Sequence, residues 1–279
     1  MDKTLILGTR IDNLTVEEAV QKIAKLCSQK TASLISTPNV EFIINAKHDN
    51  YFRTILNHES KLNLPDGIGL LWAAKFKTLP LPKVPVLREI AILLEWVATL
   101  MFLPIYPRWF HHPLREKISG SDFIWPLAKM AAKEKLRLFL LGGAPTVAER
   151  VALKLQTDIY GLRIAGVHSG SPDETEEIID AINKSKADIL LVAFGSPKQE
   201  IWLNSYLKKT ICKIGMGVGG TFDFIAGVKP RAPFWMRRVG LEWLFRLAIE
   251  PHRWKRQLAI PKFIWLVLIE RFRDAHTRD

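Results

Sequence analysis

The middle of the chain repeats one pattern of hydrophobic and polar positions. An apolar run ends in a glycine-containing turn and an amphipathic stretch follows, as in RLFLLGG before APTVAERVALKLQ and ADILLVAFGSP before KQEIWLNSYLKK. Two further apolar runs, GLRIAGVHSG and CKIGMGVGG, belong to the same series. Apolar runs without alternation, separated by helical patterns, are typical of a parallel sheet that helices cover on both faces. The predicted fold class is therefore α/β, a compact domain centred on a parallel sheet.

The first third of the chain predicts the same alternation of helices and strands. LTVEEAVQKIAKLC has the spacing of an amphipathic helix, ASLISTPNV is a strand that runs into a turn, VEFIINAKHDNYFRTILNHES is helical, and KLNLPDGIG ends in a turn. The pattern stops at residues 77–113, which are punctuated by proline and rich in leucine and tryptophan. We interpret this segment as an insertion. It is either a second membrane-facing element, such as a helical hairpin with Trp96 and Trp109, or an oligomer contact or lid.

The C-terminal residues 229–279 differ from the rest of the chain in charge. They hold 12 Lys and Arg against 5 Asp and Glu, so this segment carries +7 of the formal net charge of +12. A basic field of this kind attracts phosphate groups in nucleic acid, in anionic lipid or in a charged substrate. A chain of 279 residues can hold one large core or one domain with an appendage. We predict an α/β core at residues 1–228 and a basic, aromatic appendage at residues 229–279.

Within this appendage, the stretch WMRRVGLEWLFRLAI has apolar residues at helical spacing. Arg238 and Arg246 are eight residues apart, so one continuous helix would place both near the same side. The alternation of tryptophan with arginine favours a helix at a membrane interface over a solvated basic face on a core helix. An anionic membrane surface is therefore a predicted partner. The oligomeric state stays open, with a homo-oligomer as one alternative.

Other features of the sequence limit the class of protein. The two cysteines, Cys27 and Cys212, form neither a metal-ligand spacing nor a disulfide framework. The start of the chain lacks the pattern of a signal peptide. No apolar run reaches the roughly 18–20 residues of a transmembrane helix, and the nearest, residues 90–103, is interrupted by Glu95. We expect a protein that associates peripherally with the cytoplasmic face of a membrane.

Candidate chemistry lies in the turns that follow the predicted strands, because open α/β sheets bind ligands beyond the carboxyl ends of their strands. Asp66 stands in such a turn, between Pro65 and Gly67. It could act as a general base aimed at a ligand, or it could cap its own turn. Thr37 and Asn39 offer a hydroxyl and an amide in a neighbouring turn, either for a ligand or for the turn itself.

Three further turns could contact phosphate. Gly142 and Gly143 would let backbone N–H groups approach an anion, and residues 195–200 and 217–223 form two longer turns. The turn at Gly142 and Gly143 lacks the pattern G-x-G-x-x-G, and the chain has no G-x-x-x-x-G-K-[ST], which argues against a Rossmann dinucleotide site there and against a P-loop. The chain also lacks D-x-D, H-E-x-x-H and G-x-S-x-G. We predict no metal and no cofactor, and we expect arginines and helix ends to neutralise phosphate.

At this point the sequence resembles a known family, the WecG/TagA/CpsF-type glycosyltransferases. The segments that carry the resemblance occur in the family's order and cover most of the chain outside the insertion: TPNVEFIINAKHD, LPDGIGLLWAAK, REKISGSD, LFLLGGAPTVAE, AFGSPKQEIW, GVGGTFDFIAG and KPRAPFWMRRVGLEWLFRLAIEPHRWKRQ. The resemblance implies a compact α/β domain with a C-terminal appendage. It also implies a bacterial, inverting, membrane-associated enzyme.

The resemblance further implies the substrates. Such enzymes transfer an N-acetylmannosamine-type sugar from a UDP-sugar donor to an undecaprenyl-diphosphate-linked N-acetylglucosamine. These products serve teichoic acid linkage units and related surface polysaccharides. The exact sugar stays open, because N-acetylmannosamine, its uronic acid and other hexoses would change only a few contacts.

Roles for individual residues follow from the same resemblance. Asp66 matches the family's proposed general base, Thr37 the polar residue that shapes the sugar site, and Asn39 a further contact to the sugar. Arg253 and Arg256 would serve lipid head groups. The nucleotide side and the diphosphate would be contacted by Gln199, Gly219, Gly220, Thr221, Asp223, Arg231, Arg238 and Arg246.

One segment of the chain departs from the family pattern. The link before the segment with Arg115 and Asp122 is short in the family, whereas here residues 77–113 extend it.

Two other classes of protein are alternatives to a glycosyltransferase. The first is a nucleic-acid-binding protein, because arginines with interleaved aromatics also suit single-stranded nucleic acid. Here, however, the aromatics share a predicted helix with Leu, Ile and Val, so we predict no nucleic-acid partner. A non-catalytic membrane scaffold is the other alternative, and the presence of Thr37 and Asp66 argues against it.

Overall fold

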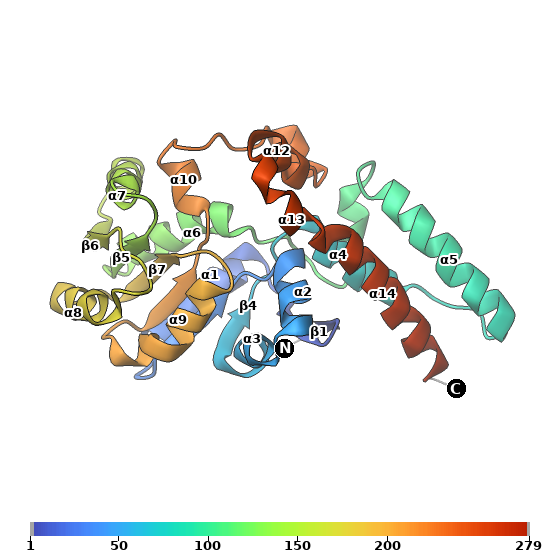
Figure 1. Cartoon of the computed structure of the whole chain (residues 1–279). Coiled ribbons are helices and arrows are strands. Elements are labelled where there is room, and N and C mark those ends of the chain that lie inside the picture. Colours follow the sequence, from blue (N-terminus) through green and yellow to red (C-terminus); the bar gives the residue numbers. More distant parts are fainter. Residues whose placement is uncertain (1–2, 278–279) are drawn as a thin grey trace.

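The computed structural model describes residues 3–277 (Figure 1). A six-stranded parallel sheet lies within it, with strand order β4-β3-β8-β7-β5-β6. This arrangement confirms the α/β fold that the apolar runs predicted. The strands of the sheet are β3 (Ser33–Ser36), β4 (Ser60–Asn63), β5 (Arg137–Gly142), β6 (Arg163–His168), β7 (Ile189–Ala193) and β8 (Ile214–Gly217).

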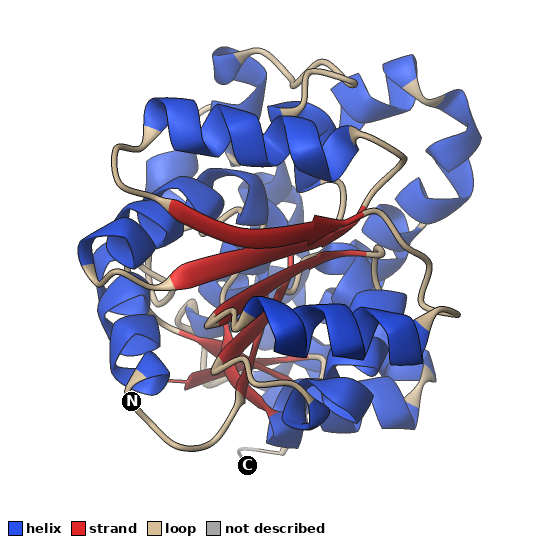
Figure 2. Ribbon diagram, turned by 90° about the vertical axis from the view of Figure 1, so that its left-hand side faces the viewer, coloured by secondary structure: helices blue, strands red, loops and turns tan. Residues whose placement is uncertain are grey.

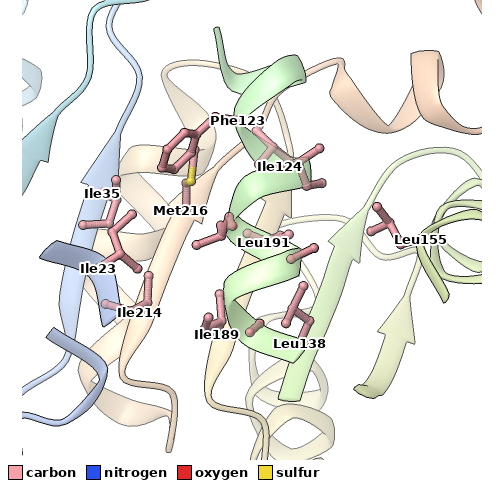
Figure 3. Packing of buried hydrophobic residues seen from close by; sticks show 14 of the residues in the cluster. Ile23, Ile35, Phe123, Ile124, Leu138, Leu155, Ile189, Leu191, Ile214 and Met216 are labelled. Atoms are coloured by element: carbon pink, nitrogen blue, oxygen red, sulfur yellow. The ribbon is translucent and has the colours of Figure 1, made fainter. Parts of the chain in front are cut away.

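Helices cover both faces of this sheet (Figure 2). In β5, Leu138 and Leu140 pack into one hydrophobic cluster, while Phe139 and Leu141 pack into another on the opposite face. Figure 3 shows the first cluster. Burial on both faces explains why the strands lack an alternating pattern. The first cluster includes residues of α1 (Val16–Cys27), α6 (Gly120–Lys133) and α7 (Val147–Asp158), and the second of α8 (Thr175–Ser185) and α9 (Lys198–Tyr206).

Short helices complete the connections around the sheet. The helical segment predicted after β3 is divided at Asp49, whose side chain accepts a hydrogen bond from the Phe52 N–H and so begins a new helix. The connecting elements are α2 (Val40–His48), α3 (Asn50–Thr54), the π-helix η1 (Ile55–Glu59), the 3-10 helix η3 (Leu207–Lys209) and α10 (Thr221–Ile225).

The chain begins with a hairpin that the sequence pattern did not predict. Strands β1 (Lys3–Ile6) and β2 (Thr9–Asp12) form a separate antiparallel sheet. Their turn contains Leu7 and Gly8 with φ angles of 48° and 79°. Two positive φ angles are typical of the tight turns that match the twist of a hairpin. Leucine is rare in such a conformation, which explains why the pattern of residues does not reveal this hairpin.

A further hydrophobic cluster lies among helices beside the sheet. It includes residues of α4 (Ile68–Thr78), α5 (Pro85–Phe102) and α14 (Ala259–His276). The predicted insertion therefore holds one long helix, followed by the 3-10 helix η2 (Pro107–Phe110), so the helical hairpin was wrong. Helix α5 is anchored to its neighbours by two indoles: Trp72 donates to Thr99 Oγ1 at 3.0 Å, and Trp96 donates to the Ile264 carbonyl at 3.3 Å.

The basic C-terminal segment crosses from the sheet to this helical cluster (Figure 1). The single helix predicted around residues 235–249 is wrong, because the chain turns at Gly240, which has a φ of 82°. Arg238 and Arg246 therefore lie on different helices. None of the helices within residues 3–277 is long and apolar enough to cross a membrane. The elements before α14 are α11 (Phe234–Arg238), α12 (Glu242–Ile249), the 3-10 helix η4 (Pro251–Arg253) and α13 (Trp254–Gln257).

Candidate active site

Two adjoining cavities lie beyond the carboxyl ends of strands in the half of the sheet that contains β4, β3 and β8. The larger has a volume of about 350 Å³ and the smaller about 130 Å³. The turns after β3 and β4 line both, which agrees with the expectation that ligands bind at this edge of a parallel sheet. Residues that line both cavities are Asn39, Glu41, Asp66, Arg246, Arg253 and Arg256.

Asp66 lies where the two cavities meet. Its N–H donates to the Pro38 carbonyl at 2.8 Å, and Gly67 then turns with a φ of 98° into helix α4. Within residues 3–277 the Asp66 carboxyl accepts no hydrogen bond, so it does not cap its own turn. The backbone thus fixes the residue while its carboxyl stays available to a ligand.

The surroundings of Asp66 change its acidity. Burial raises its pKa to about 6, and the nearby Glu242 carboxylate acts in the same direction. Arg246 and Lys117 oppose this effect by stabilising the charged form. A carboxyl with a pKa near 6 is mostly ionised at neutral pH and still basic enough to accept a proton.

Thr37 and Asn39 lie in the turn after β3, the strand next to β4, and line the smaller cavity together with Asp66. Asn39 caps helix α2, because its Oδ1 accepts a hydrogen bond from the Phe42 N–H at 3.1 Å. Thr37 is buried and lines the smaller cavity. A Cβ at Gly120 would lie 3.4 Å from Thr37 Oγ1, so this glycine lets the start of α6 approach the threonine. The three residues predicted to surround the sugar are therefore together.

Gln199 connects two of the predicted turns. Its Oε1 accepts hydrogen bonds from the Gly195 N–H at 3.1 Å and the Gly219 N–H at 3.0 Å. It also lines the smaller cavity, together with Gly220. Since the side chain is 2% exposed and holds both turns, its first effect is to fix the shape of that cavity.

Glu200 is a buried acid that the sequence reasoning missed. Its Oε1 accepts a hydrogen bond from Gln199 Nε2 at 2.7 Å, and burial raises its pKa to about 8. At neutral pH the carboxyl is therefore mostly protonated. An acid in the first turn of a helix is ordinarily exposed, so nothing in the residue order marked Glu200 as buried.

Thr221 and Asp223, the other residues predicted for the nucleotide side, also line the smaller cavity. Thr221 Oγ1 lies 3.2 Å from the Ser121 hydroxyl, and Asp223 pairs with Lys229 at 2.9 Å. Gly142 and Gly143 line neither cavity. Their φ angles are 94° and 89°, so their conformation and the packing around β5 require glycine there.

The arginines divide into two groups. Arg246, Arg253 and Arg256 line both cavities, whereas Arg231 and Arg238 line neither. Arg231 instead forms a bidentate ion pair with Asp122, with both N···O distances at 2.7 Å. Arg237, which the sequence reasoning did not select, lines the larger cavity. Arg237 and Arg238 both belong to α11, and Arg238 is exposed.

The cavity arginines are clustered and held by carboxylates. Arg246 pairs with Glu242 at 2.8 Å, and Arg256 contacts Glu41 through two bonds of 2.8 and 2.9 Å. Burial and the neighbouring Arg256 and Arg246 lower the pKa of Arg253, a sign of mutual repulsion among the cations. The buried Nε–H groups of Arg246 and Arg253 have no partner. Such a cluster suits an anion with several oxygen atoms, such as a diphosphate.

Among the described residues, no three His, Cys, Asp or Glu side chains are placed to hold a metal ion. The site thus combines one carboxylate of raised pKa with a cluster of arginines, at the carboxyl edge of a parallel sheet. This is the architecture of an α/β enzyme that handles a phosphorylated substrate.

The chain belongs to the glycosyl transferase WecG/TagA/CpsF family, whose sequence model matches residues 4–101 and 96–277. It is a transferase. The match is divided inside α5, where the sequence predicts an insertion.

Two relatives illustrate the membership. The N-acetylglucosaminyldiphosphoundecaprenol N-acetyl-beta-D-mannosaminyltransferase of Bacillus subtilis (strain 168) is 31% identical over 242 residues, which cover 87% of this chain and 81% of that protein. The protein of the same name from Bacillus spizizenii (strain ATCC 23059 / NRRL B-14472 / W23) is 29% identical over 240 residues, 86% of this chain and 80% of that protein.

Proposed function

We propose that this protein transfers an N-acetylmannosamine-type sugar from a UDP-sugar donor to an undecaprenyl-diphosphate-linked N-acetylglucosamine. The activity that names the two Bacillus relatives supports the acceptor and the transferred sugar. The observation that carries the proposal for this chain is the position of Asp66. Its carboxyl lies between a small polar cavity and a larger one, and arginines line both.

In this proposal part of the UDP-sugar enters the smaller cavity. Gly219, Gly220 and Thr221 line it and would contact the nucleotide side, while Thr37 and Asn39 would contact the sugar. Arg246 and Arg253 would hold the donor diphosphate, since their unpartnered Nε–H groups are available donors. A bidentate guanidinium is well matched to phosphate oxygens.

The acceptor would enter from the larger cavity with its hydroxyl facing Asp66. Asp66 would take the proton of that hydroxyl while the oxygen attacks the anomeric carbon from the side opposite the UDP. The bond to the acceptor oxygen forms as the bond to the UDP oxygen breaks, so the configuration inverts. The arginines would stabilise the charge that develops on UDP, without a metal ion.

We also propose that the enzyme works at the cytoplasmic face of the membrane, where a lipid-linked acceptor is anchored. Exposed tryptophans and neighbouring basic residues in the C-terminal segment support peripheral contact with an anionic surface. Two of these are Trp235 at 61% and Trp254 at 53% exposure, with Lys255 beside the second.

A donor panel followed by a transfer assay tests the proposed function. Thermal unfolding is measured with a series of UDP-sugars. The donors that stabilise the protein are then offered with a short-chain lipid diphosphate N-acetylglucosamine, with and without EDTA. We expect UDP-N-acetylmannosamine to give product of inverted configuration and EDTA to leave the rate unchanged. Transfer only from another sugar would correct the donor, metal-dependent turnover would overturn the metal-free mechanism, and absence of transfer from every donor would overturn the function.

A further inference from the structure

The larger cavity has two chemically different ends. Its polar end lies at Asp66 and includes Lys117 and four arginines, Arg237, Arg246, Arg253 and Arg256. Its other end is hydrocarbon. The apolar residues that line this end are Trp72, Leu100, Leu103, Ile260, Phe263 and Ile264.

Three helices form the apolar end, and they are fixed against one another. Trp72 of α4 and Phe263 of α14 are each 1% exposed and pack edge to face, with ring centroids 6.4 Å apart. Leu100 belongs to α5 and Leu103 directly follows it, and the indole hydrogen bonds to Thr99 and the Ile264 carbonyl hold this helix in place. The apolar end is therefore a wall built by packed helices.

This distribution of charge and hydrocarbon selects an amphiphilic ligand. The five cations at the polar end outnumber its three carboxylates, Glu41, Asp66 and Glu242, so this end favours anions. In the proposed function Arg246 and Arg253 hold the donor diphosphate, which leaves Lys117, Arg237 and Arg256 for a second anion. The aliphatic and aromatic side chains at the other end exclude a charged group. A nucleoside diphosphate would leave the apolar end in contact with water. A lipid whose head group is a diphosphate matches both ends.

We propose that the apolar end of this cavity holds the first isoprenoid units of the acceptor, next to its diphosphate. This inference rests on the proposed function, because it assumes that the acceptor is a polyprenyl diphosphate. Helix α5, which the sequence marks as an insertion, supplies one wall of this lipid groove. The inserted segment thus contributes to recognition of the acceptor tail.

The surroundings of the groove provide a route for the rest of the tail. Met101 and Ile105, which are close in sequence to the groove residues Leu100 and Leu103, are 70% and 74% exposed. Helices α5 and α14 lie side by side at the end of the molecule opposite β6 (Figure 1). A tail that leaves the groove there meets an apolar surface, which can face a bilayer.

Acceptors of different tail length test the groove without a membrane. Diphosphate-linked N-acetylglucosamine acceptors with one, two and four isoprene units are assayed as monomers in solution. Because each buried methylene stabilises binding, KM should fall about tenfold or more from one to four units, with little change in kcat. A tail that stays entirely in the bilayer would give a KM independent of length under these conditions. That result, with transfer intact, would overturn the groove and leave the proposed function standing.

Two matched variants of helix α5 test whether the groove causes the dependence of KM on tail length. Leu100→Gln places an amide in the groove and should reduce the dependence of KM on tail length by about threefold or more. Leu94→Gln, on the outer face of α5 where the side chain is 66% exposed, should keep the wild-type dependence. Equal behaviour of the two variants would contradict the groove.

Other outcomes of these experiments distinguish the lipid groove from a contact between two copies of the chain and from failure of the proposed function. If the groove seats a second copy of the chain, Leu100→Gln should change the mass in solution and leave the tail dependence intact, which would overturn the proposal. The wild-type length series keeps the proposal falsifiable if Leu100→Gln fails to fold. No transfer to any lipid diphosphate by folded protein would overturn the proposed function, and the groove with it.

Discussion

The parallel sheet and the cluster of helices α4, α5 and α14 form different surfaces around the same carboxylate, that of Asp66. On the sheet side the smaller cavity is formed by backbone turns, which Gln199 holds through the N–H groups of Gly195 and Gly219. On the helical side, α4, α5 and α14 add an apolar wall to the larger cavity. Asp66 and three arginines belong to both cavities.

This difference separates two kinds of specificity. Hydrogen bonds from fixed turns can discriminate among nucleotides and sugars, because an unmatched polar group in a buried site is costly. Apolar walls discriminate mainly by the length of the hydrocarbon that they cover. We therefore expect changes on the sheet side to affect the donor, and changes on the helical side to affect KM for the acceptor. Changes at the shared residues should affect turnover itself.

The largest effect is expected at the shared carboxylate. Asp66→Asn keeps the size of the side chain and removes its basicity, so kcat should fall by about 10²–10⁴-fold while UDP-sugar affinity stays near wild type. Steady-state transfer and calorimetric binding of UDP measure the two quantities. Asp180→Asn, on the exposed face of α8, is the matched control and should behave as wild type. Unimpaired turnover in Asp66→Asn would remove Asp66 from the mechanism.

The arginines provide the next largest effect. Arg246→Ala removes a cation from both cavities, so kcat/KM should fall by about 10²–10³-fold. Arg238→Ala removes an exposed cation that lines neither cavity and should change kcat/KM little. Kinetics of both variants with a soluble short-chain acceptor make the comparison. A greater loss in Arg238→Ala would support the single helix expected from the residue spacing and contradict the break at Gly240.

The smallest effect concerns stability on the sheet side. Glu200 keeps its proton in the folded state up to a pKa of about 8, whereas the unfolded chain releases it near the ordinary value of 4.5. Its contribution to stability is therefore lost as pH rises between these values. Glu200→Gln should raise the melting temperature, relative to wild type, on the order of a few degrees more at pH 8 than at pH 5. Glu177→Gln, exposed on α8, is the control. An equal difference at the two pH values would contradict a buried, protonated Glu200.

The sheet side of the fold could be predicted from the sequence because its signals are local. Runs such as RLFLLGG and ILLVAFG are apolar without alternation, and only strands buried on both faces require that. The turns after them then follow from the parallel order of the strands. Asp66, Thr37 and Asn39 come together for this reason, although they belong to two different strand ends.

Other features could not be predicted because they depend on tertiary contacts or on a single backbone angle. The helical spacing continues through residues 235–249, and only the left-handed conformation of Gly240 divides it. A Cβ there would lie 2.4 Å from Ile68 Cγ2, so the close approach to α4 requires glycine. Which of the two adjacent arginines of α11 lines the cavity is likewise set in the folded chain: Arg237 does and Arg238 does not. Likewise, Gly142 and Gly143 resemble phosphate-binding glycines in sequence, yet they serve the packing of β5.

The most direct test of the central claim is the pH dependence of kcat/KM in the wild type and in Asp66→Asn. The claim is that Asp66, between the two cavities, removes the proton from the acceptor. Its pKa of about 6 predicts that wild-type kcat/KM is constant above pH 7 and falls about tenfold per unit well below pH 6, as the carboxyl gains a proton. The residual activity of Asp66→Asn should lack this fall. The same acid limb in both proteins would show that another group is the base.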